Sequence, residues 1–186
     1  AFTGSTQVGK LIQKSLAGRD VGLTLELGGK AANIVYEDAA IDQAVEGVVN
    51  GIFFNQGHVC CAGSRLLLQE SIHDEFVAKL EKRMQTLRVG NPLDKNTDIG
   101  AINSKEQLNK IEGLVNEGVS DGGKIFQTEC ELPGNGFWFK PTLFTDVQPS
   151  YSIAREEIFG PVLTTLTFRT PQEAVEIANN TEYGLS

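Results

Sequence analysis

The sequence predicts an α/β fold in which a mostly parallel sheet lies between two layers of helices. Short apolar runs are typical of strands, among them RLLLQ (65–69) and PVLTTLTF (161–168). Segments with helical spacing lie between such runs, as at 72–87, whose apolar face holds Phe76, Leu80, Met84 and Leu87. Strands that alternate with helices favour parallel pairing, because each crossover helix packs back on a face of the sheet.

The first part of the chain is expected to hold two helices and two strands. Ser5 or Thr6 can cap a helix with one apolar face: Val8, Leu11, Ile12 and Leu16. Strands at 23–27 and 33–36 flank the glycines of GGKAA, which permit backbone conformations that other residues disfavour. Asp38 is the expected cap of a helix that ends at Gly57 and buries an apolar stripe: Ile41, Ala44, Val45, Val48, Val49, Ile52 and Phe53.

Two later helices begin with capping boxes, in which a hydroxyl residue precedes Glu or Gln by three positions: Ser104 with Gln107, and Thr170 with Glu173. Strands are expected near 124–127 and 139–147. The segment ends at NNTEYGLS, where an α/β unit would enter its next strand, and it begins inside a glycine turn. We therefore expect a segment of a longer enzyme, truncated at both ends.

Composition excludes several classes of function. The 186 residues carry a net charge of −8 without a basic stripe, which argues against nucleic acid as a partner. Apolar runs are far shorter than a membrane span, and no signal peptide is recognisable, so no membrane partner is expected. The odd count of three cysteines (Cys60, Cys61, Cys130) favours a reducing, cytoplasmic compartment.

Two ligand motifs are incomplete. GSTQVGK (4–10) resembles a phosphate loop, but Leu11 follows it where magnesium binding needs a hydroxyl. A glycine turn that opens a helix can still offer N–H groups to a phosphate, or be a plain capping turn. No C-x-x-C or H-x-x-x-H pair occurs, so no metal site is expected.

Two segments carry candidate carboxylates. Glu26 lies inside LTLEL (23–27), where burial would raise its pKa and make it a proton acceptor, whereas an edge strand would turn it toward water. Glu156 and Glu157 precede Phe159 and a Gly-Pro pair. Adjacent residues on an extended segment point to opposite sides, so at most one of these glutamates faces a given site.

FFNQGHVCCAGSR (53–65) carries the candidate nucleophile. Cys60 has small neighbours, and local N–H groups or cations would make its thiolate reactive, although free cysteines are often inert core residues. His58 could pair with Cys60 or could simply be a surface histidine.

Together these segments resemble the aldehyde dehydrogenase superfamily. LELGGKAA is similar to its glutamate signature, FFNQGHVCCAGSR to its cysteine signature and EEIFGPV to a third fingerprint, in the family's order. FTGSTQVG, VGNPLD, KPTLF and NNTEYGLS match as well, so the resemblance covers essentially the whole chain. It implies the catalytic-domain segment of an NAD- or NADP-dependent aldehyde dehydrogenase.

The resemblance also implies residue roles. Cys60 matches the nucleophile that forms a thiohemiacetal and then a thioester, and its N–H would be half of an oxyanion hole. Cys61 is then expected to be a packed neighbour. Glu26 matches the base that activates the hydrolytic water. Residues implied to bind the coenzyme are Gly4 and Ser5 near the pyrophosphate, Leu27 and Phe159 at the nicotinamide, and Glu157 at its ribose.

By the same resemblance, residues 1–28 are the tail of a coenzyme-binding domain, and 29–186 are an incomplete catalytic domain whose full-length parent forms a homo-oligomer. An isolated fragment would then be inactive. Two departures from the family pattern stand out: His58 where Gln or sometimes Glu is usual, and DIGAINS (98–104) in place of the commoner Gly-Pro form. A scaffold protein of the same fold and a coenzyme-free thiol esterase remain alternatives.

Overall fold

The computed structural model describes residues 1–186 and contains two sheets. A two-stranded parallel sheet pairs β1 (Phe2–Thr3) with β2 (Leu25–Glu26). A five-stranded sheet has the order β3-β4-β7-β6-β5, with all pairs parallel except β5 with β6. Its strands are β3 (Ala32–Val35), β4 (Arg65–Gln69), β5 (Lys124–Gln127), β6 (Thr142–Thr145) and β7 (Val162–Phe168). The expected α/β fold with a mostly parallel sheet is confirmed.

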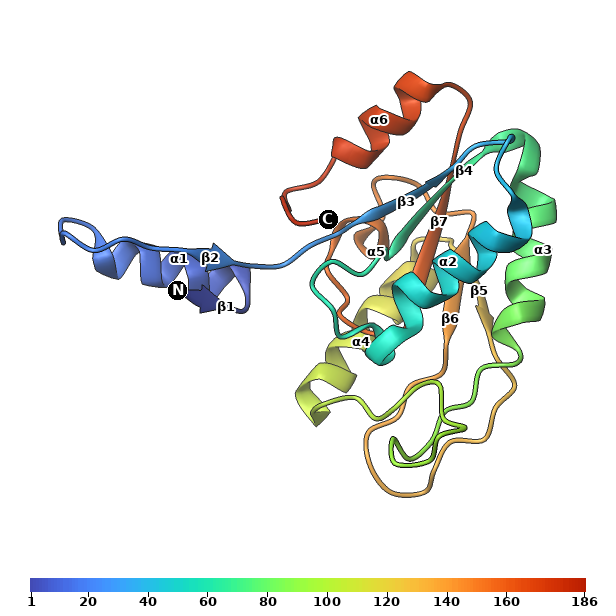
Figure 1. The fold of residues 1–186 in the computed structure, drawn as a ribbon, viewed down its shortest axis with the longest axis horizontal. Coiled ribbons are helices and arrows are strands. Elements are labelled where there is room, and N and C mark those ends of the chain that lie inside the picture. Colours follow the sequence, from blue (N-terminus) through green and yellow to red (C-terminus); the bar gives the residue numbers. More distant parts are fainter.

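Helices cover both faces of the five-stranded sheet (Figure 1). The helices longer than four residues in this body are α2 (Ile41–Phe53), α3 (His73–Met84), α4 (Lys105–Ser120) and α6 (Pro171–Asn179). Short helices η1 (Phe54–Gly57), η2 (Glu70–Ile72) and α5 (Ser152–Arg155) lie in the connections. The sheet is therefore the middle of three layers.

Successive side chains along each strand contact opposite helix layers, because they point to opposite faces of the sheet. Leu66, Leu68 and Leu163 pack with α2 and α3 in a cluster of 17 buried residues. On the other face, Phe144 and Val162 pack with α4 and α5, while a smaller cluster joins β4 and β7 to α6. The apolar stripes of α2 and α3 are buried as their spacing predicts.

The segment from β1 to β2 projects from the body, with α1 (Thr6–Leu16) lying on these two strands, and we call it the projecting unit (Figure 1). Ser5 caps α1 by accepting from the N–H of Val8, as expected. The apolar face of α1 is only partly covered: Val8 is 42% and Leu11 65% exposed, whereas Ile12 and Leu16 are half-buried. Gly9 is the one buried residue of this helix, and it packs against Leu27.

Two expected boundaries are wrong. The strand expected at 23–27 contains only Leu25 and Glu26, because β1 offers only two residues for pairing. Asp38 lies in a turn after β3, and α2 begins after Ala40 with no side-chain cap. No helix in the structure is long and apolar enough to cross a bilayer.

Candidate active site

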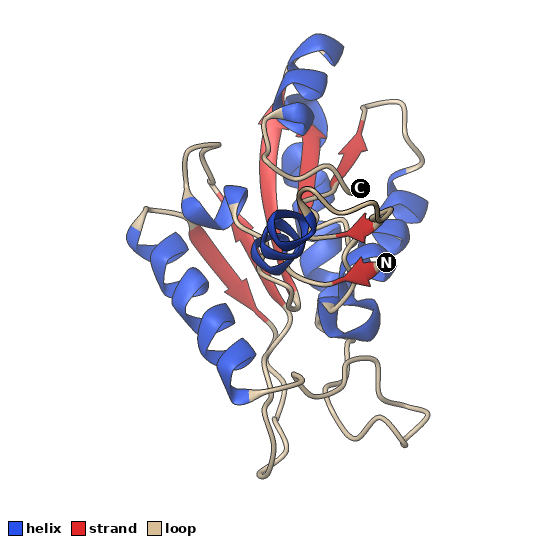
Figure 2. Cartoon of the chain, turned by 90° about the vertical axis from the view of Figure 1, so that its left-hand side faces the viewer, coloured by secondary structure: helices blue, strands red, loops and turns tan.

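The pocket beside Cys60, which we call the main pocket, lies between the projecting unit and the body, and its volume is about 480 Å³. Figure 2 looks at the molecule from the side of the projecting unit, with α1 in front of the body. The projecting unit provides Thr3, Gly4 and Ser5, and the joint between it and the body (residues 27–29) provides Leu27 and Gly28. The body provides His58, Val59, Cys60, Gln107, Lys110, Glu157 and Phe159. Six of the seven predicted site residues thus line one pocket.

Left-handed backbone turns the chain from α2 toward Cys60. Asn55, Gln56 and Gly57 have φ values of 50°, 48° and 73°. Left-handed φ is uncommon for residues other than glycine. At Gly57 a Cβ would lie 2.2 Å from the carbonyl oxygen of Gly160, so this turn is in direct contact with the Gly-Pro segment. The cysteine and EEIFGPV motifs are therefore packed together.

Gly28 and Gly29 bring the glutamate motif into the same place. A Cβ on Gly29 would lie 2.2 Å from the carbonyl oxygen of Cys60, so only glycine allows this approach. The N–H of Gly29 also donates to Glu157 Oε1 at 3.0 Å. Three motifs that are distant in sequence thus meet at one pair of glycines.

The two adjacent glutamates point to different sites, as the extended backbone predicts. Glu157 is half-buried and lines the main pocket, whereas Glu156 is exposed and lines a separate polar pocket with Tyr183. The N–H of Glu157 donates to the Tyr183 hydroxyl at 3.3 Å. Burial raises the pKa of Tyr183, so its hydroxyl stays protonated at neutral pH.

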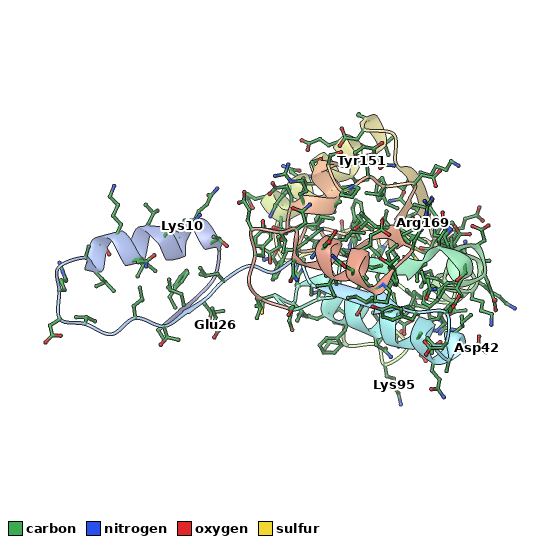
Figure 3. The ribbon with its side chains drawn as sticks, turned by 90° about the horizontal axis from the view of Figure 1, so that it is seen from above. Lys10, Glu26, Asp42, Lys95, Tyr151 and Arg169 are labelled. Atoms are coloured by element: carbon green, nitrogen blue, oxygen red, sulfur yellow. The ribbon has the colours of Figure 1, made fainter.

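Glu26 does not join the other predicted site residues. It is exposed on β2 and does not line the pocket, whereas its neighbour Leu27 does. Figure 3 shows Glu26 on the side of β2 away from α1. The alternative of a strand glutamate turned toward water therefore describes Glu26 in this chain.

The two adjacent cysteines also differ. Cys60 is half-buried and lines the pocket, whereas Cys61 is exposed, although the expectation for Cys61 was a packed neighbour. Cys130 is a third free cysteine, and Thr128 donates to its sulfur at 3.4 Å. No group of three or more His, Cys, Asp or Glu side chains could hold a metal ion.

His58 is neither a surface residue nor visibly paired with Cys60. Its half-buried ring stacks on Phe159, with centroids 5.2 Å apart and planes 14° from parallel. Nε2 accepts from the N–H of Asn103 at 3.3 Å, while Nδ1 is buried without a hydrogen-bond partner. Burial lowers the pKa of His58, against the opposing influence of the nearby Phe159 main chain and the Asn103 side chain.

Sequence reasoning missed a buried cation behind the glycine pair. Lys30 is 1% exposed, and its Nζ has no hydrogen-bond partner. Burial, with a smaller contribution from Arg65, lowers the pKa of Lys30 to about 7, while Glu157 and Glu156 act in the opposite direction. Arg65 in turn donates to the carbonyls of Lys30, Ile177 and Ala178. A lysine between two apolar strands was the available signal.

Gln107 and Lys110 were also missed, and both line the pocket from α4. The Ser104 hydroxyl accepts from the N–H of Gln107, as the capping box predicts. The Gln107 amide, however, donates to the carbonyls of Ile158 and Phe159 at 2.8 and 2.9 Å. The three-residue spacing of Gln107 and Lys110 on one helix face was the available signal.

The pocket has groups that fit a dinucleotide. Glu157 Oε1 is occupied by Gly29, but Oε2 makes no hydrogen bond within the chain and can accept from sugar hydroxyls. Space beside this carboxylate depends on Gly28, whose Cβ would lie 2.6 Å from Oε2. Lys110 and the N-terminus of α1 at Gly4 and Ser5 offer positive charge to phosphates.

Comparison with known proteins agrees with this geometry. The aldehyde dehydrogenase family matches residues 1–186, so the chain belongs to this family. Retinal dehydrogenase 2 of Taeniopygia guttata is 49% identical over 190 residues, which cover 100% of this chain and 36% of that protein. The human retinal dehydrogenase 2 is 48% identical with the same coverage. The chain thus spans 36% of the length of these relatives.

Solved structures show the same fold at high similarity. An NAD-dependent aldehyde dehydrogenase from Sinorhizobium meliloti matches with a TM-score of 0.95 and 42% identity, over 98% of this chain and 37% of that one. A betaine aldehyde dehydrogenase from Staphylococcus aureus, solved in complex with NAD⁺, matches with a TM-score of 0.93 and 40% identity over the same shares. The fold of this chain is therefore that of part of an aldehyde dehydrogenase.

Proposed function

We propose that the full-length protein oxidises an aldehyde to a carboxylic acid with NAD or NADP as hydride acceptor. The observation that carries this proposal is the contact of Gly29 with both the Cys60 carbonyl and the Glu157 carboxylate, which brings a thiol and a carboxylate together in one pocket. Residues 1–28 would belong to the coenzyme-binding domain and 29–186 to the catalytic domain, with the pocket between them.

In this proposal Cys60 is the nucleophile. Its thiolate attacks the aldehyde carbon, and the N–H of Cys60 donates to the oxygen that becomes negatively charged. A bound coenzyme would supply the hydride acceptor at this pocket, and loss of hydride from the thiohemiacetal carbon would leave a thioester on Cys60. Water activated by Glu26 then releases the acid and the free thiol.

The coenzyme would be held at four places. Glu157 would accept from the ribose hydroxyls of the nicotinamide half, and Leu27 and Phe159 would lie beside the nicotinamide ring. Gly4 and Ser5 would bind near the pyrophosphate. We also propose that the full-length protein is a cytoplasmic homo-oligomer, a setting consistent with three free cysteines.

The test compares Cys60→Ser with Cys61→Ser in the full-length protein, with NAD and NADP and a panel of aldehydes. Cys60→Ser should lower NAD(P)H production by at least about 10³-fold, because the nucleophile is lost. Cys61→Ser should retain most of the activity, since Cys61 does not line the pocket.

Two results would replace this function by an alternative. Failure of iodoacetamide to label Cys60 at neutral pH would favour a scaffold protein. Ester hydrolysis at a rate that the coenzyme does not change, together with no aldehyde oxidation, would favour a thiol esterase.

Glu26 has its own test, because it is exposed outside the pocket. In the full-length protein, Glu26→Gln should still release one equivalent of NAD(P)H rapidly, since hydride transfer does not need the base. Later turnovers should slow by about 10²- to 10⁴-fold. Glu37→Gln, which changes an exposed glutamate after β3, is the control. Steady turnover by Glu26→Gln at the normal rate would assign the base to another residue.

A further inference from the structure

His58 connects the two segments in which the chain departs from the family pattern. Its Nε2 accepts from the N–H of Asn103, inside the 98–104 segment. The same segment lies against the cysteine turn at Gly100, where a Cβ would be 3.2 Å from Gln56 Oε1. The unusual residue and the unusual segment are thus in contact.

We infer that His58 is a positioning residue, whose ring holds Phe159 against the nucleophile turn by stacking. This inference rests on the proposed function, in which Phe159 lies beside the nicotinamide. His58, Cys60 and Phe159 all line the pocket. The stack therefore joins the side of the pocket that carries the thiol to the side that would receive the coenzyme.

Phe159 needs such support because its backbone is strained. Its φ is 55°, a left-handed value that is unfavourable for an aromatic residue unless surrounding contacts maintain it. Gln107 holds the carbonyls of Ile158 and Phe159 from α4. Among the aromatic side chains, His58 is the one whose ring packs on the Phe159 ring. Backbone and side chain are thus held from two different elements.

The His58 ring is itself fixed. The backbone N–H of His58 donates to the carbonyl of Asn55 at 2.9 Å, and the Asn55 side-chain amide donates to the backbone carbonyl of His58 at 3.2 Å, so the main chain that carries the ring is held on both sides. Nε2 can accept from Asn103 only in the neutral ring, and burial lowers the pKa of His58, which favours that form. Glutamine, the usual family residue here, could accept the same bond but has no ring to stack.

The experiment separates the two roles of His58, the ring that stacks on Phe159 and the nitrogen that accepts from Asn103. In the full-length protein, His58→Phe keeps a ring and removes the acceptor, His58→Gln keeps an acceptor and removes the ring, and His58→Ala removes both. Asn103 is exposed, so water can replace the lost acceptor in His58→Phe. His73→Gln is the matched control, because His73 is the chain's other histidine and lies on α3 outside the pocket.

Three quantities are measured: the Kd for NAD, the rate of Cys60 alkylation by iodoacetamide, and hydrogen–deuterium exchange of residues 156–161. His58→Ala and His58→Gln should raise the Kd roughly three- to tenfold, as expected for loss of one aromatic pair, and should speed exchange of 156–161. His58→Phe should stay within about twofold of the unmodified protein in Kd, as should His73→Gln. Alkylation of Cys60 should proceed in every variant.

Two results would overturn the inference. One is a His58→Ala protein with unchanged Kd and exchange, and the other is a His58→Phe protein as impaired as His58→Ala. Failure of the proposed function looks different, since the unmodified protein would then produce no NAD(P)H. In that case, exchange of 156–161 in His58→Ala and His58→Phe still decides whether the ring holds this loop.

Discussion

The body and the projecting unit are stabilised by different interactions. In the body, the two faces of the five-stranded sheet carry clusters of 17 and 11 buried residues, with a third cluster of four. In residues 1–28 only Gly9 and Gly28 are buried, and two apolar residues of α1, Val8 and Leu11, are exposed. Even so, both regions supply walls of the same pocket.

The difference shows that the site depends on close backbone contacts as much as on apolar burial. At the joint, Gly29 lies against the Cys60 carbonyl and pairs with Leu185 in an isolated parallel bridge. These backbone contacts hold the joint in place, although none of the three apolar clusters includes its residues. The body supplies the residues that the joint contacts, and these contacts set where the projecting unit lies against the body.

The largest expected effect compares one residue type in the two regions. Leu66→Ala should lower the free energy of unfolding of the 186-residue chain by about 2–5 kcal/mol, because Leu66 is fully buried on β4 and its loss leaves a cavity. Leu11→Ala should change it by less than about 0.5 kcal/mol, since Leu11 is 65% exposed. Urea titration followed by circular dichroism measures both. A Leu11→Ala loss as large as that of Leu66→Ala would remove the contrast between the regions.

The next effect is at the joint. Gly29→Ala should reduce activity of the full-length protein by about 10²-fold, because the new Cβ meets carbonyl oxygens of Cys60 and Leu185 that cannot move freely. Gly22→Ala is the matched control, since a Cβ there has nothing within 4 Å. NAD(P)H production and thermal unfolding are measured together. Equal behaviour of the two variants would show that the joint tolerates displacement.

The last effect, the smallest when it is taken per pH unit, is a pH dependence of stability from Lys30. The folded chain holds the pKa of Lys30 at about 7, below the value of 10.5 in the unfolded chain. Between these values the unfolded chain binds more protons, so the Lys30 contribution makes stability rise with pH, by up to about 1.4 kcal/mol per unit. Below pH 7 both states are protonated, and this contribution no longer changes.

Lys30→Met should flatten this rise, and its stabilising effect should increase as the pH falls from 9 to 7 and stay at its maximum below pH 7, where the folded chain buries the charged lysine. Urea titrations at pH 7, 8 and 9 measure the change in slope. Lys79→Met is the control, because Lys79 lies on the surface of α3 and pairs with Asp42 and Glu75. An unchanged slope in Lys30→Met would show that Nζ stays solvated.

Local patterns predicted most of the body. The strands at 65–69 and 124–127 occur at the expected residues, and Ser104 and Thr170 cap their helices. The position of a strand and the cap of a helix depend on apolar runs or on neighbours in sequence, which can be read directly. The motif resemblance likewise indicated six of the residues that line the pocket.

Other features depended on contacts between distant segments. The exposed positions of Glu26 and Cys61, the burial of Lys30 and the second role of Gln107 could not be read from residues near them in sequence. Each depends on which segment packs opposite, since burial and hydrogen-bond partners are set by neighbours in space.

The sequence alone determined the alternation of strands and helices and the order of the three motifs, because these are properties of residue type and spacing. The resemblance of these motifs to the aldehyde dehydrogenase family then indicated Cys60 as the candidate nucleophile. The tertiary structure decided that His58 stacks on Phe159, and that Gly29 touches both Cys60 and Glu157. These contacts join residues about 30 to 130 positions apart, and only packing of the folded sheet and its loops brings them within contact distance.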